Sequence, residues 1–554
     1  MNECSVKFSE KYLNYGWNKR RIGKNIVWYK GSFCKGSIDD FAKSISLIFS
    51  KYGNNYKAQL DIFLKKMTGG FAFIFESESV TIAVVDNISS IPIYYSRNDN
   101  KFILSDSPKV LKENDLLDED SVIPLIMSGY TIGSRTLYSS IKKLTPFEYI
   151  SSFKGLIYFG RYSNYLPVNS TNEKQLIDSY YDCLMTVIKD MYDNIKDKHI
   201  VVLLSGGSDS RLIASSLKHI GAKNITCMTY GIESSEEVRV SKEVAKNLGF
   251  DHVFISLNKN MAKEYFLSEE FDDYFTSMDS YSSVPYISEI YQIRKYLDIC
   301  KFPSSEVVFI NGNTGDFLNG SHIPDTSKNW ESIGDVIDYV YNKHYSMWGY
   351  MKNDANKLAV SRMLLDDLYS TIPKNFLNNI SYESIYEIIE YYGRQSHLIV
   401  TNQRIYDFFG CDWKMPFWDS RYVEFWESVG IDNKVEHKLY SQAINEWNLG
   451  GVWENIPINK KSIKPNWIAP LRFFAKAILF SLNKKHLWNQ VERSIFYYWM
   501  EPYRSYYPKG YKDVLSDTRG QRYYMSWWIE KYAKNHNIIS KLKFFNKNTS
   551  KKSV

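Results

Sequence analysis

Two short polar segments of this chain carry residue types that could act on a phosphate. Residues 205–210 read Ser-Gly-Gly-Ser-Asp-Ser after the apolar run 199–204, and residues 311–316 read Asn-Gly-Asn-Thr-Gly-Asp after the apolar run 307–310. Ligands of parallel sheets gather at the carboxyl ends of strands, so we expect the two segments to share one triphosphate. Asp209 and Asp316 would then suit Mg²⁺, which prefers one or two carboxylates together with phosphate oxygens and water.

The first segment has the layout of an anion site. The run 199–204 predicts a strand buried on both faces, and Leu212, Ile213 and Leu217 predict a helix directly after the glycine turn, closed by Gly221. Turn amides and a helix N-terminus would then point at one negative group. The Walker A ending and the third glycine of the dinucleotide fingerprint are both absent. An ordinary strand–turn–helix corner is the alternative interpretation.

The six-residue pattern resembles the pyrophosphate loop of N-type ATP pyrophosphatases, which cleave ATP between the α and β phosphates and leave an adenylate. Residues 311–316 resemble the Ser-Gly-Glu-Gly-Ser-Asp segment of asparagine synthetases, and residues 415–419, Met-Pro-Phe-Trp-Asp, resemble that family's Val-Pro-Phe-Leu-Asp. Over roughly residues 20–465 the chain is therefore similar to the asparagine synthetase family. The resemblance implies a parallel-sheet α/β ATP pyrophosphatase domain, of the adenine nucleotide alpha hydrolase-like kind, that uses ATP and Mg²⁺.

The resemblance also assigns site residues. Thr229, Tyr230 and Gly231 fall where family members hold adenine. The expected nucleotide-binding set is Leu204, Ser205, Gly206, Gly207, Ser208, Asp209, Ser210, Thr229, Tyr230, Gly231, Gly312 and Gly315. The expected catalytic set is Asp209, Asp316, Asn313 and Lys461, with Asp209 and Asp316 also as metal ligands. One lysine among Lys460, Lys461 and Lys464 is expected to support the phosphates, and Lys461 is the candidate.

Residues 70–73, Gly-Phe-Ala-Phe, then Asp86 with Pro92, residues 94–95, and the run 102–105 follow one another in the order of a class II glutamine amidotransferase domain, which the N-terminal half resembles. It departs from that family at the residues that do the chemistry. The family's glutaminase uses an N-terminal cysteine, whereas Asn2 stands at position 2 and Cys4 would need removal of three residues to become terminal. Residues 30–32, Lys-Gly-Ser, fall on the family's Asn-Gly-Glu turn and lack its carboxylate. We predict a degenerate domain without glutaminase activity.

The synthetase half departs as well. Asn313 stands where the family has a glutamate thought to help deprotonate the incoming amine, and an amide cannot do this. Either another base serves or the nitrogen nucleophile differs. Loss of glutaminase features with a retained adenylation loop is the pattern of relatives that make amides from amines or amino acids, such as β-lactam synthetases and lasso-peptide cyclases.

The sequences of segments 209–214, 229–231 and 315–324 look most like those of relatives in bacterial surface-polysaccharide pathways. This similarity implies an enzyme that adenylates a carboxylate and transfers ammonia or an amine to it, with a nucleotide- or lipid-linked uronic acid as the candidate substrate. A true asparagine synthetase using ammonia and a peptide- or β-lactam-type cyclase stay open. A non-catalytic nucleotide-binding relative is the alternative from a different class.

Composition gives the domain plan. The 554 residues, 44% of them hydrophobic, suffice for two or more domains. We predict an α+β sandwich over 1–165, the parallel-sheet domain over 171–465 and a helical, aromatic and basic extension over 466–554. We expect the boundary in the linker 166–171, with a capping box from Ser170 to Glu173.

Compartment and partners follow from weaker signals. Six scattered Cys without a CxxC pattern indicate reduced thiols, and the chain shows neither a signal peptide nor an 18-residue apolar run, so we expect a cytoplasmic protein. The net charge of +7 is too small to argue for nucleic acid as a partner. A homodimer is compatible with the sequence.

The C-terminal extension allows two interpretations. Leu471, Phe474, Ile478, Leu479 and Leu482 form an apolar stripe, and five lysines follow between 541 and 552. We favour a core helix followed by a solvated tail. Contact with an anionic membrane surface is the second interpretation. Three isolated histidines are read as surface or core residues rather than ligands: His344, His397 and His437.

Overall fold

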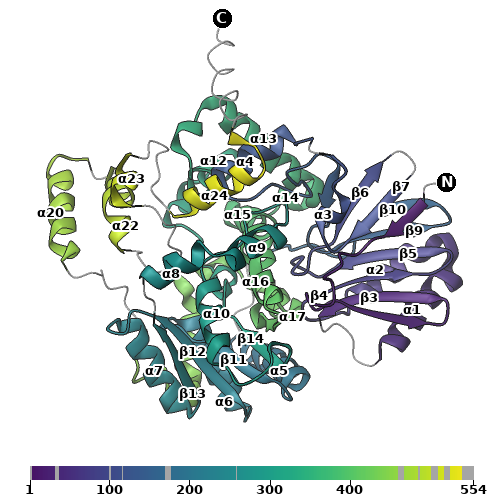
Figure 1. Ribbon diagram of the computed structural model, residues 1–554, viewed down its shortest axis with the longest axis horizontal. Helices are drawn as coiled ribbons and strands as arrows, with labels where there is room; N and C mark the ends of the chain where they lie inside the picture. The colour runs from purple at the N-terminus through teal and green to yellow at the C-terminus, as the bar shows by residue number, and fades with distance from the viewer. Residues whose placement is uncertain are drawn as a thin grey trace, which may run out of the picture.

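The computed structural model describes residues 3–31, 37–98, 101–114, 116–168, 176–256, 259–458, 467–484, 487–500, 510–516 and 524–539. Figure 1 shows a β-rich part at the N-terminal end of the chain, a sheet flanked by helices, and a helical part between and above them. No helix among these residues is both long and apolar enough to cross a bilayer.

The N-terminal part is the predicted sandwich. One sheet has the order β1-β7-β6-β8 and the other β10-β9-β5-β4-β3-β2. The strands are β1 (Glu3–Val6), β2 (Asn18–Ile22), β3 (Asn25–Gly31), β4 (Phe71–Glu76), β5 (Val80–Val85), β6 (Tyr94–Asn98), β7 (Lys101–Ser105), β8 (Ile141–Lys143), β9 (Glu148–Phe153) and β10 (Leu156–Arg161). The pairing of β4 with β5 across residues 77–79 confirms the predicted hairpin.

Strand β4 shows why this sandwich has three layers. It is apolar at nearly every position, so it buries both faces rather than one. Ile74 packs between the two sheets, and Phe73 packs on the opposite side against Phe41. Phe41 belongs to α1 (Ile38–Tyr52), which with α2 (Tyr56–Leu64) accompanies the larger sheet (Figure 1). The predicted helix at 38–50 is confirmed, and it supplies the third layer.

The second part is a five-stranded parallel sheet of order β13-β12-β11-β14-β15. Its strands are β11 (His199–Leu203), β12 (Ile225–Gly231), β13 (Asp251–Ser256), β14 (Val307–Ile310) and β15 (Asp412–Lys414). Four of its helices are α5 (Leu176–Ile195), α6 (Ser208–His219), α7 (Glu236–Leu248) and α10 (Ile290–Ile299). The predicted parallel sheet is confirmed, and β11 and β14 are neighbours at its centre, as the site requires.

Helices complete the body around this sheet. They include α8 (Lys259–Phe266), α9 (Glu269–Ser277), α11 (Gly315–Leu318), α12 (Ile333–His344), α13 (Asp354–Thr371), α15 (Tyr382–Glu390), α16 (Arg404–Phe408), α17 (Ser420–Ser428) and α19 (Lys438–Trp447). Contacts join them to the sandwich: the Asn87 side chain donates to Trp418 O at 3.2 Å. The domain limits stay a prediction, and the proposed Ser170–Glu173 capping box lies outside the described residues.

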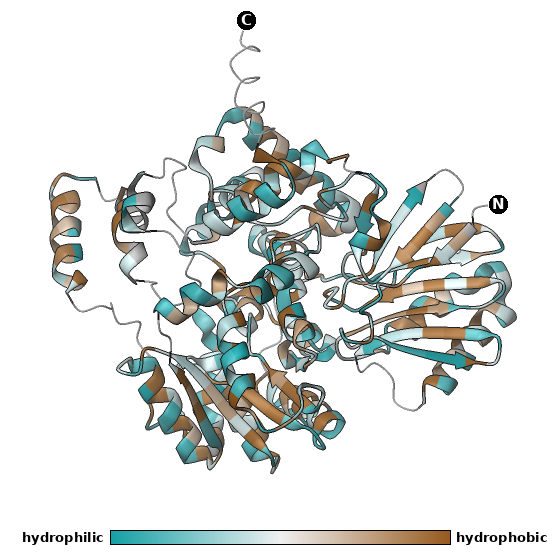
Figure 2. Ribbon diagram, in the orientation of Figure 1, coloured by the Kyte–Doolittle hydropathy of each residue, from teal (hydrophilic) through white to brown (hydrophobic). Residues whose placement is uncertain are grey.

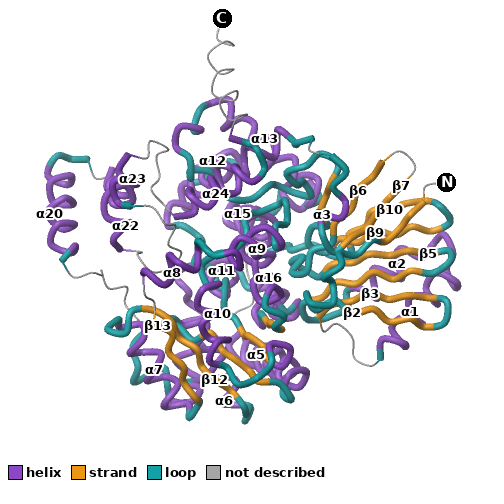
Figure 3. The backbone as a smooth tube through the Cα atoms, in the orientation of Figure 1, coloured by secondary structure: helices purple, strands orange, loops and turns teal. Residues whose placement is uncertain are grey.

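The C-terminal extension divides into two kinds of helix. The helix α24 (Tyr524–Asn535) returns to the body, where Trp528 and Ile529 are fully buried. The helix α20 (Ile468–Ser481) stands apart at the edge of the molecule, beside α22 (Tyr497–Met500) and α23 (Tyr511–Ser516) (Figures 1 and 3). Leu471, Phe474 and Ile478 of α20 are exposed, so the core-helix interpretation of this stripe is wrong. The lysines after residue 540 lie outside the described residues.

Candidate active site

The turn after β11 forms as the sequence predicts. The Ser205 N–H donates to Ser210 Oγ at 3.0 Å, and the Gly207 N–H donates to Ser205 Oγ at 3.2 Å, so two serines close the turn on itself. Helix α6 begins at Ser208, and no side chain caps it at Gly207. Its first amides are therefore oriented toward the turn without a side-chain acceptor, which is the arrangement that binds phosphate oxygens.

The loop after β14 packs directly against this turn, and two glycines make the contact possible. A Cβ added at Gly312 would lie 3.0 Å from Ser210 N. A Cβ added at Gly315 would lie 2.6 Å from the Phe417 ring and 3.1 Å from Asp209 Cγ. The two glycines were predicted as nucleotide-binding residues. The structure places them at the junction of the two loops, where any side chain would push the loops apart.

Asp209 and Asp316 meet at this junction. The Asp316 N–H donates to Asp209 Oδ2 at 2.9 Å, and the Tyr440 hydroxyl of α19 donates to Asp209 Oδ1 at 3.0 Å. Desolvation, and next the charge of Asp316, raise the pKa of Asp209 to about 7. Two carboxylates in so small a space repel each other and favour a cation between or beside them.

Asp316 has the opposite surroundings. Burial acts to raise its pKa, but the hydrogen bond and charge of His322, with the charges of Arg394 and His437, bring the pKa below its ordinary value. The Nε2 of His322 lies 3.6 Å from Asp316 Oδ2. Of the two carboxylates, Asp316 is thus held ionised by cations, while Asp209 lacks such a partner.

These two carboxylates are compatible with a magnesium ion whose remaining ligands come from outside the protein. Among the described residues, no group of three or more His, Cys, Asp or Glu could hold a metal by itself. Magnesium does not need one, because it commonly binds one or two carboxylates and completes its shell with phosphates and water. The raised pKa of Asp209 is the local sign of a carboxylate that a cation would stabilise.

The predicted adenine residues lie at the end of β12, next to β11. Thr229 Oγ1 donates to Leu204 O at 2.7 Å, so these two residues tie the strand ends together. The Tyr230 hydroxyl donates to Glu289 Oε1 at 3.1 Å. The structure therefore brings Thr229, Tyr230 and Gly231 to the same edge as the turn, with the first two side chains already engaged in protein contacts.

Of the predicted catalytic residues, Asn313 is described by the structure and Lys461 is not. The Asn313 N–H donates to Asn311 Oδ1 at 2.7 Å, which helps to fix the conformation of the loop. The residue Asn313 is partly exposed. Lys461 lies outside the described residues, as do Lys460 and Lys464. The chain just before them is held to α6, because the Arg211 guanidinium donates to the carbonyls of Ile456 at 2.7 Å and Pro457 at 3.1 Å.

A buried polar cluster beside Asp316 was missed by the sequence analysis. Glu390 of α15 has no exposed side-chain surface; it accepts from the Tyr386 hydroxyl at 2.9 Å and pairs with His344. His322 Nδ1 lies 3.9 Å from its other oxygen. Burial acts to raise the pKa of Glu390, but His344, His322 and Lys343 hold it well below its ordinary value. The sequence signal was slight, because Glu390 is the third glutamate of its helix, after Glu383 and Glu387, and His344 is far from it in sequence.

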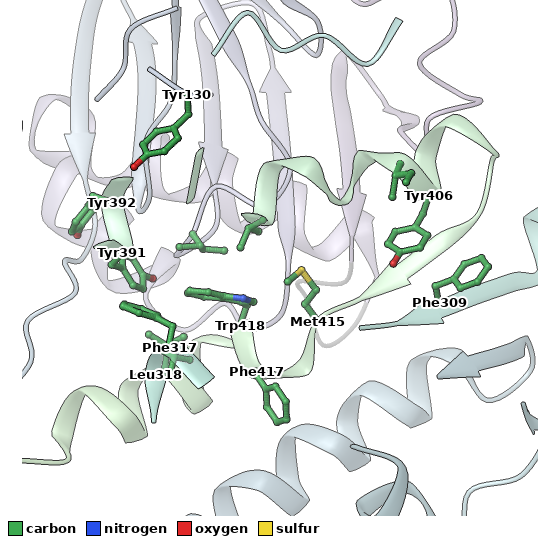
Figure 4. Packing of buried hydrophobic residues seen from close by; sticks show 14 of the residues in the cluster. Tyr130, Phe309, Phe317, Leu318, Tyr391, Tyr392, Tyr406, Met415, Phe417 and Trp418 are labelled. Atoms are coloured by element: carbon green, nitrogen blue, oxygen red, sulfur yellow. The ribbon is translucent and has the colours of Figure 1, made fainter. Parts of the chain in front are cut away.

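The apolar support of the second loop comes from residues 415–418. Figure 4 shows Trp418 lying between Met415 and the rings of Phe317 and Tyr391. The Trp418 Nε1–H donates to Thr314 Oγ1 at 2.8 Å. Thr314 has a left-handed backbone, with φ of 65°, so this bond helps to hold a strained turn.

In the N-terminal part, Cys4 and Lys30 are both held in protein contacts. Cys4 lies in β1 and packs into the core between the two sheets. Burial raises the pKa of its thiol to about 11. Lys30, which the sequence comparison aligned with a glutamine-binding turn, is buried in an ion pair with Asp407 at 2.5 Å. It lines a cavity of about 180 Å³ between the two parts of the chain.

The parallel sheet and its paired loops are consistent with an asparagine synthase domain. Residues 194–441 match the family model described as asparagine synthase. Members of that family are ATP-dependent ligases.

Among curated proteins, the chain is similar to the "Probable asparagine synthetase [glutamine-hydrolyzing]" of Acanthamoeba polyphaga mimivirus, with 26% identity over 258 residues. The match covers 43% of this chain and 42% of that protein, so the chain spans less than half the length of this relative.

Two solved structures show weak similarity. The glutamine phosphoribosylpyrophosphate amidotransferase of B. subtilis, complexed with ADP and GMP, has 10% identity and a TM-score of 0.17, covering 55% of this chain and 59% of that one. A structure titled as the allosteric regulatory enzyme of purine biosynthesis has 12% identity and a TM-score of 0.18, covering 43% and 71%. Neither similarity supports an inference about this chain.

Proposed function

We propose that this chain is an ATP-dependent ligase that adenylates a carboxylate and then forms an amide from the acyl group and ammonia or an amine. The observation that carries the proposal is the contact of the two loops, which brings Asp209 against the backbone of Asp316 at the ends of adjacent strands. The asparagine synthase match supports the reaction class.

The proposed reaction has two steps, adenylation of the carboxylate and then formation of the amide. A substrate carboxylate oxygen attacks the α-phosphorus of ATP, the bond from that phosphorus to the bridging oxygen breaks, and pyrophosphate leaves. The amine nitrogen then attacks the acyl carbon, AMP leaves with its electron pair, and the nitrogen loses a proton.

Named residues would supply binding and charge for the first step. The turn at residues 205–208 and the N-terminus of α6 are suited to hold the phosphates. Asp209 and Asp316 would hold Mg²⁺, which when bound neutralises charge on the leaving pyrophosphate. Tyr440 fixes the orientation of Asp209 by its hydrogen bond to Oδ1.

The proposed nitrogen donor depends on Asn313 and Cys4, neither of which has the chemistry that glutamine-dependent synthesis needs. Asn313 is an amide, so it cannot take the proton of the amine, and the Cys4 thiol is protonated at neutral pH. Free ammonia or an amino compound therefore suits the site better than glutamine. For the acid we propose a nucleotide- or lipid-linked uronic acid, because the loop sequences are similar to those of synthetase relatives in surface-polysaccharide pathways. Aspartate with ammonia, and a cyclase-type substrate, are the alternatives.

Product analysis tests the reaction class. The full chain is incubated with ATP, Mg²⁺ and a panel of uronic acids, aspartate and amines, and nucleotides are separated by anion-exchange chromatography. We expect acid-dependent AMP and pyrophosphate, with the amide product detected by mass spectrometry. Acid-dependent ADP would contradict the proposal, and nucleotide binding without any ATP–pyrophosphate exchange across the panel would favour a non-catalytic relative.

A further inference from the structure

The helix α20 presents an apolar face that the rest of the described chain does not cover. Among the residues that the structure describes, seven of its twenty-three exposed large hydrophobic residues lie between 467 and 482. Phe473 is 69% exposed, Phe474 64% and Ile478 58%. A contiguous apolar surface of this kind on a single short helix marks an interaction site rather than ordinary surface.

The opposite face of α20 shows that the helix is anchored in its own small unit. Ile468, Ala475 and Leu479 pack against a cluster that contains Trp488 and Phe496. Arg472 pairs with Glu492 and lies 5.2 Å from the Trp488 ring centroid. Figure 2 shows this largely hydrophobic helix at the edge of the molecule, away from the main core. The exposed face is therefore held outward by packing on the inner face.

The charged residues of α20 and of the chain on either side of it are cations, and Glu492, the acid that pairs with Arg472, belongs to the packing on the inner face. Residues 455–490 contain seven Lys and Arg and no Asp or Glu, in a chain that has 62 acidic residues in all. Lys476 lies on the flank of the exposed face, 5.2 Å from the Phe480 ring, and the exposed Lys484 follows the end of the helix. An exposed apolar face with Lys476 and Lys484 beside it complements a surface that is apolar beneath and negative above.

We propose that α20 is an interfacial anchor that lies in the plane of a membrane containing anionic lipids. Its fourteen residues make a helix of about 21 Å, shorter than the roughly 30 Å of a bilayer core, so it would lie along the surface rather than span it. Phe473, Phe474 and Ile478 would enter the acyl boundary, and Lys476 would extend its ammonium toward the headgroups.

A second copy of this chain is the competing occupant, and the charges disfavour it. A symmetric contact through α20 would bring the same cations of two copies together, and residues 455–490 offer no acid to pair with them. The membrane proposal does not depend on the ligase activity, because binding is measured without substrate.

Vesicle sedimentation of the full chain tests the proposal. One set of vesicles contains phosphatidylcholine alone, and the other contains about 30% phosphatidylglycerol as the anionic lipid. We expect at least about tenfold tighter binding to the anionic vesicles. The double variant F474S/I478S should lose at least about tenfold in affinity. The variant K476E/K484E should lose the preference for anionic lipid.

The controls separate membrane contact from damage to the fold. Leu156 is 76% exposed on β10 and Leu358 53% on α13, so L156S/L358S removes as much exposed apolar surface elsewhere and should bind vesicles like the unchanged chain. All variants should keep the unfolding temperature of the unchanged chain. Equal sedimentation of F474S/I478S and the unchanged chain would overturn the proposal. So would absence of vesicle binding together with a dimer that F474S/I478S dissociates, which would assign the face to a second copy.

Discussion

Asp86 and Asp209 are two aspartates that each follow a strand, one in the N-terminal sandwich and one in the parallel sheet, and their surroundings differ. Asp86 is fully buried and accepts from the backbone N–H groups of Phe71, Ile88 and Ser90 at 2.8–3.0 Å, and from the Ser90 hydroxyl. Burial raises its pKa, and every named neighbour acts in the other direction by donating to it.

Asp209 has fewer donors and a competing charge. It is half-buried, accepts from Tyr440, from the Asp316 backbone and, over 3.4 Å, from the Ser208 hydroxyl, and lies beside the Asp316 carboxylate. A carboxylate whose oxygens are all satisfied stabilises a fold, whereas one left short of donors next to a second carboxylate is suited to bind a cation. The comparison therefore separates a structural aspartate from a functional one by donors and charge, not by residue type or by position after a strand.

The largest expected effect is on adenylation. Replacing Asp209 or Asp316 by Asn removes one charge from the predicted magnesium–pyrophosphate contact, so each variant should lose about 10²-fold or more in ATP–pyrophosphate exchange. The fold should remain, because Asn can still accept one hydrogen bond at position 209. Exchange is measured over a range of magnesium concentrations, and normal rates in both variants would show that these carboxylates are not the site.

The matched change in the sandwich should act on stability. Asp86→Ala leaves three backbone N–H groups and one hydroxyl without their acceptor, at about 1 kcal/mol each, so the free energy of unfolding should fall by about 4 kcal/mol. Urea unfolding followed by circular dichroism measures this. If Asp86→Ala instead unfolds like the unchanged chain but loses exchange, the contrast with Asp209 fails.

Gly315 tests the contact between the two loops. A Cβ there would meet the Phe417 ring at 2.6 Å, so Gly315→Ala should overpack the junction and cost about 1–3 kcal/mol, with reduced exchange. The added variant Phe417→Leu should recover part of both losses by making room. Gly334→Ala, where the nearest group is the Ser332 hydroxyl at 3.3 Å, is the matched control and should change neither.

The sequence predicted the loops and strands that form the site, but not all the residues that determine its electrostatics. Glycines and apolar runs have local causes, so the turn at 205–210, the helix after it and the neighbouring strands β11 and β14 were predictable from spacing. Tyr440 reaches Asp209 from a helix far away in sequence, and Glu390 reaches His322 from another. His322 is only six residues after Asp316, but nothing in the sequence marks it as the partner of that carboxylate. Strand β15 has only three residues, too few for a periodic pattern.

The exposed apolar stripe of α20 is a second feature that the sequence predicted only in part. Its apolar pattern predicted a helix correctly, but periodicity cannot say what covers a helix. Only the placement of residues 468–481 away from the main core shows that this face is open. Burial, unlike helix formation, is a property of the whole chain.

Glu427 gives a smaller, pH-dependent effect in the helical region. Burial raises its pKa to about 7, well above the value of an unfolded glutamate. Its folded form therefore binds a proton more tightly, and the stability it contributes is present below about pH 4.5 and is lost as the pH rises through about 7. Glu427→Gln keeps an acceptor for the Leu166 N–H and removes this loss. The variant should match the unchanged chain at pH 5 and be about 1–2 kcal/mol more stable at pH 8, by urea unfolding. A larger difference at pH 5 than at pH 8 would contradict the assignment.

The smallest expected effect is at Cys4, where the prediction is no change at all. A glutaminase needs a thiolate, and a thiol with a pKa of about 11 is ionised in only about one molecule in 10⁴ at neutral pH. Its neighbours are Thr81 and Ser152, hydroxyl groups that cannot act as a base at this pH, and Glu76, whose charge disfavours the thiolate further. Cys4→Ala should therefore leave ammonia-dependent amide synthesis unchanged, and neither form should release glutamate from glutamine. Glutamate release by the unchanged chain that Cys4→Ala abolishes would show instead that the N-terminal part retains a glutaminase. Intact-mass measurement of the same sample would then tell whether trimming has made Cys4 the first residue.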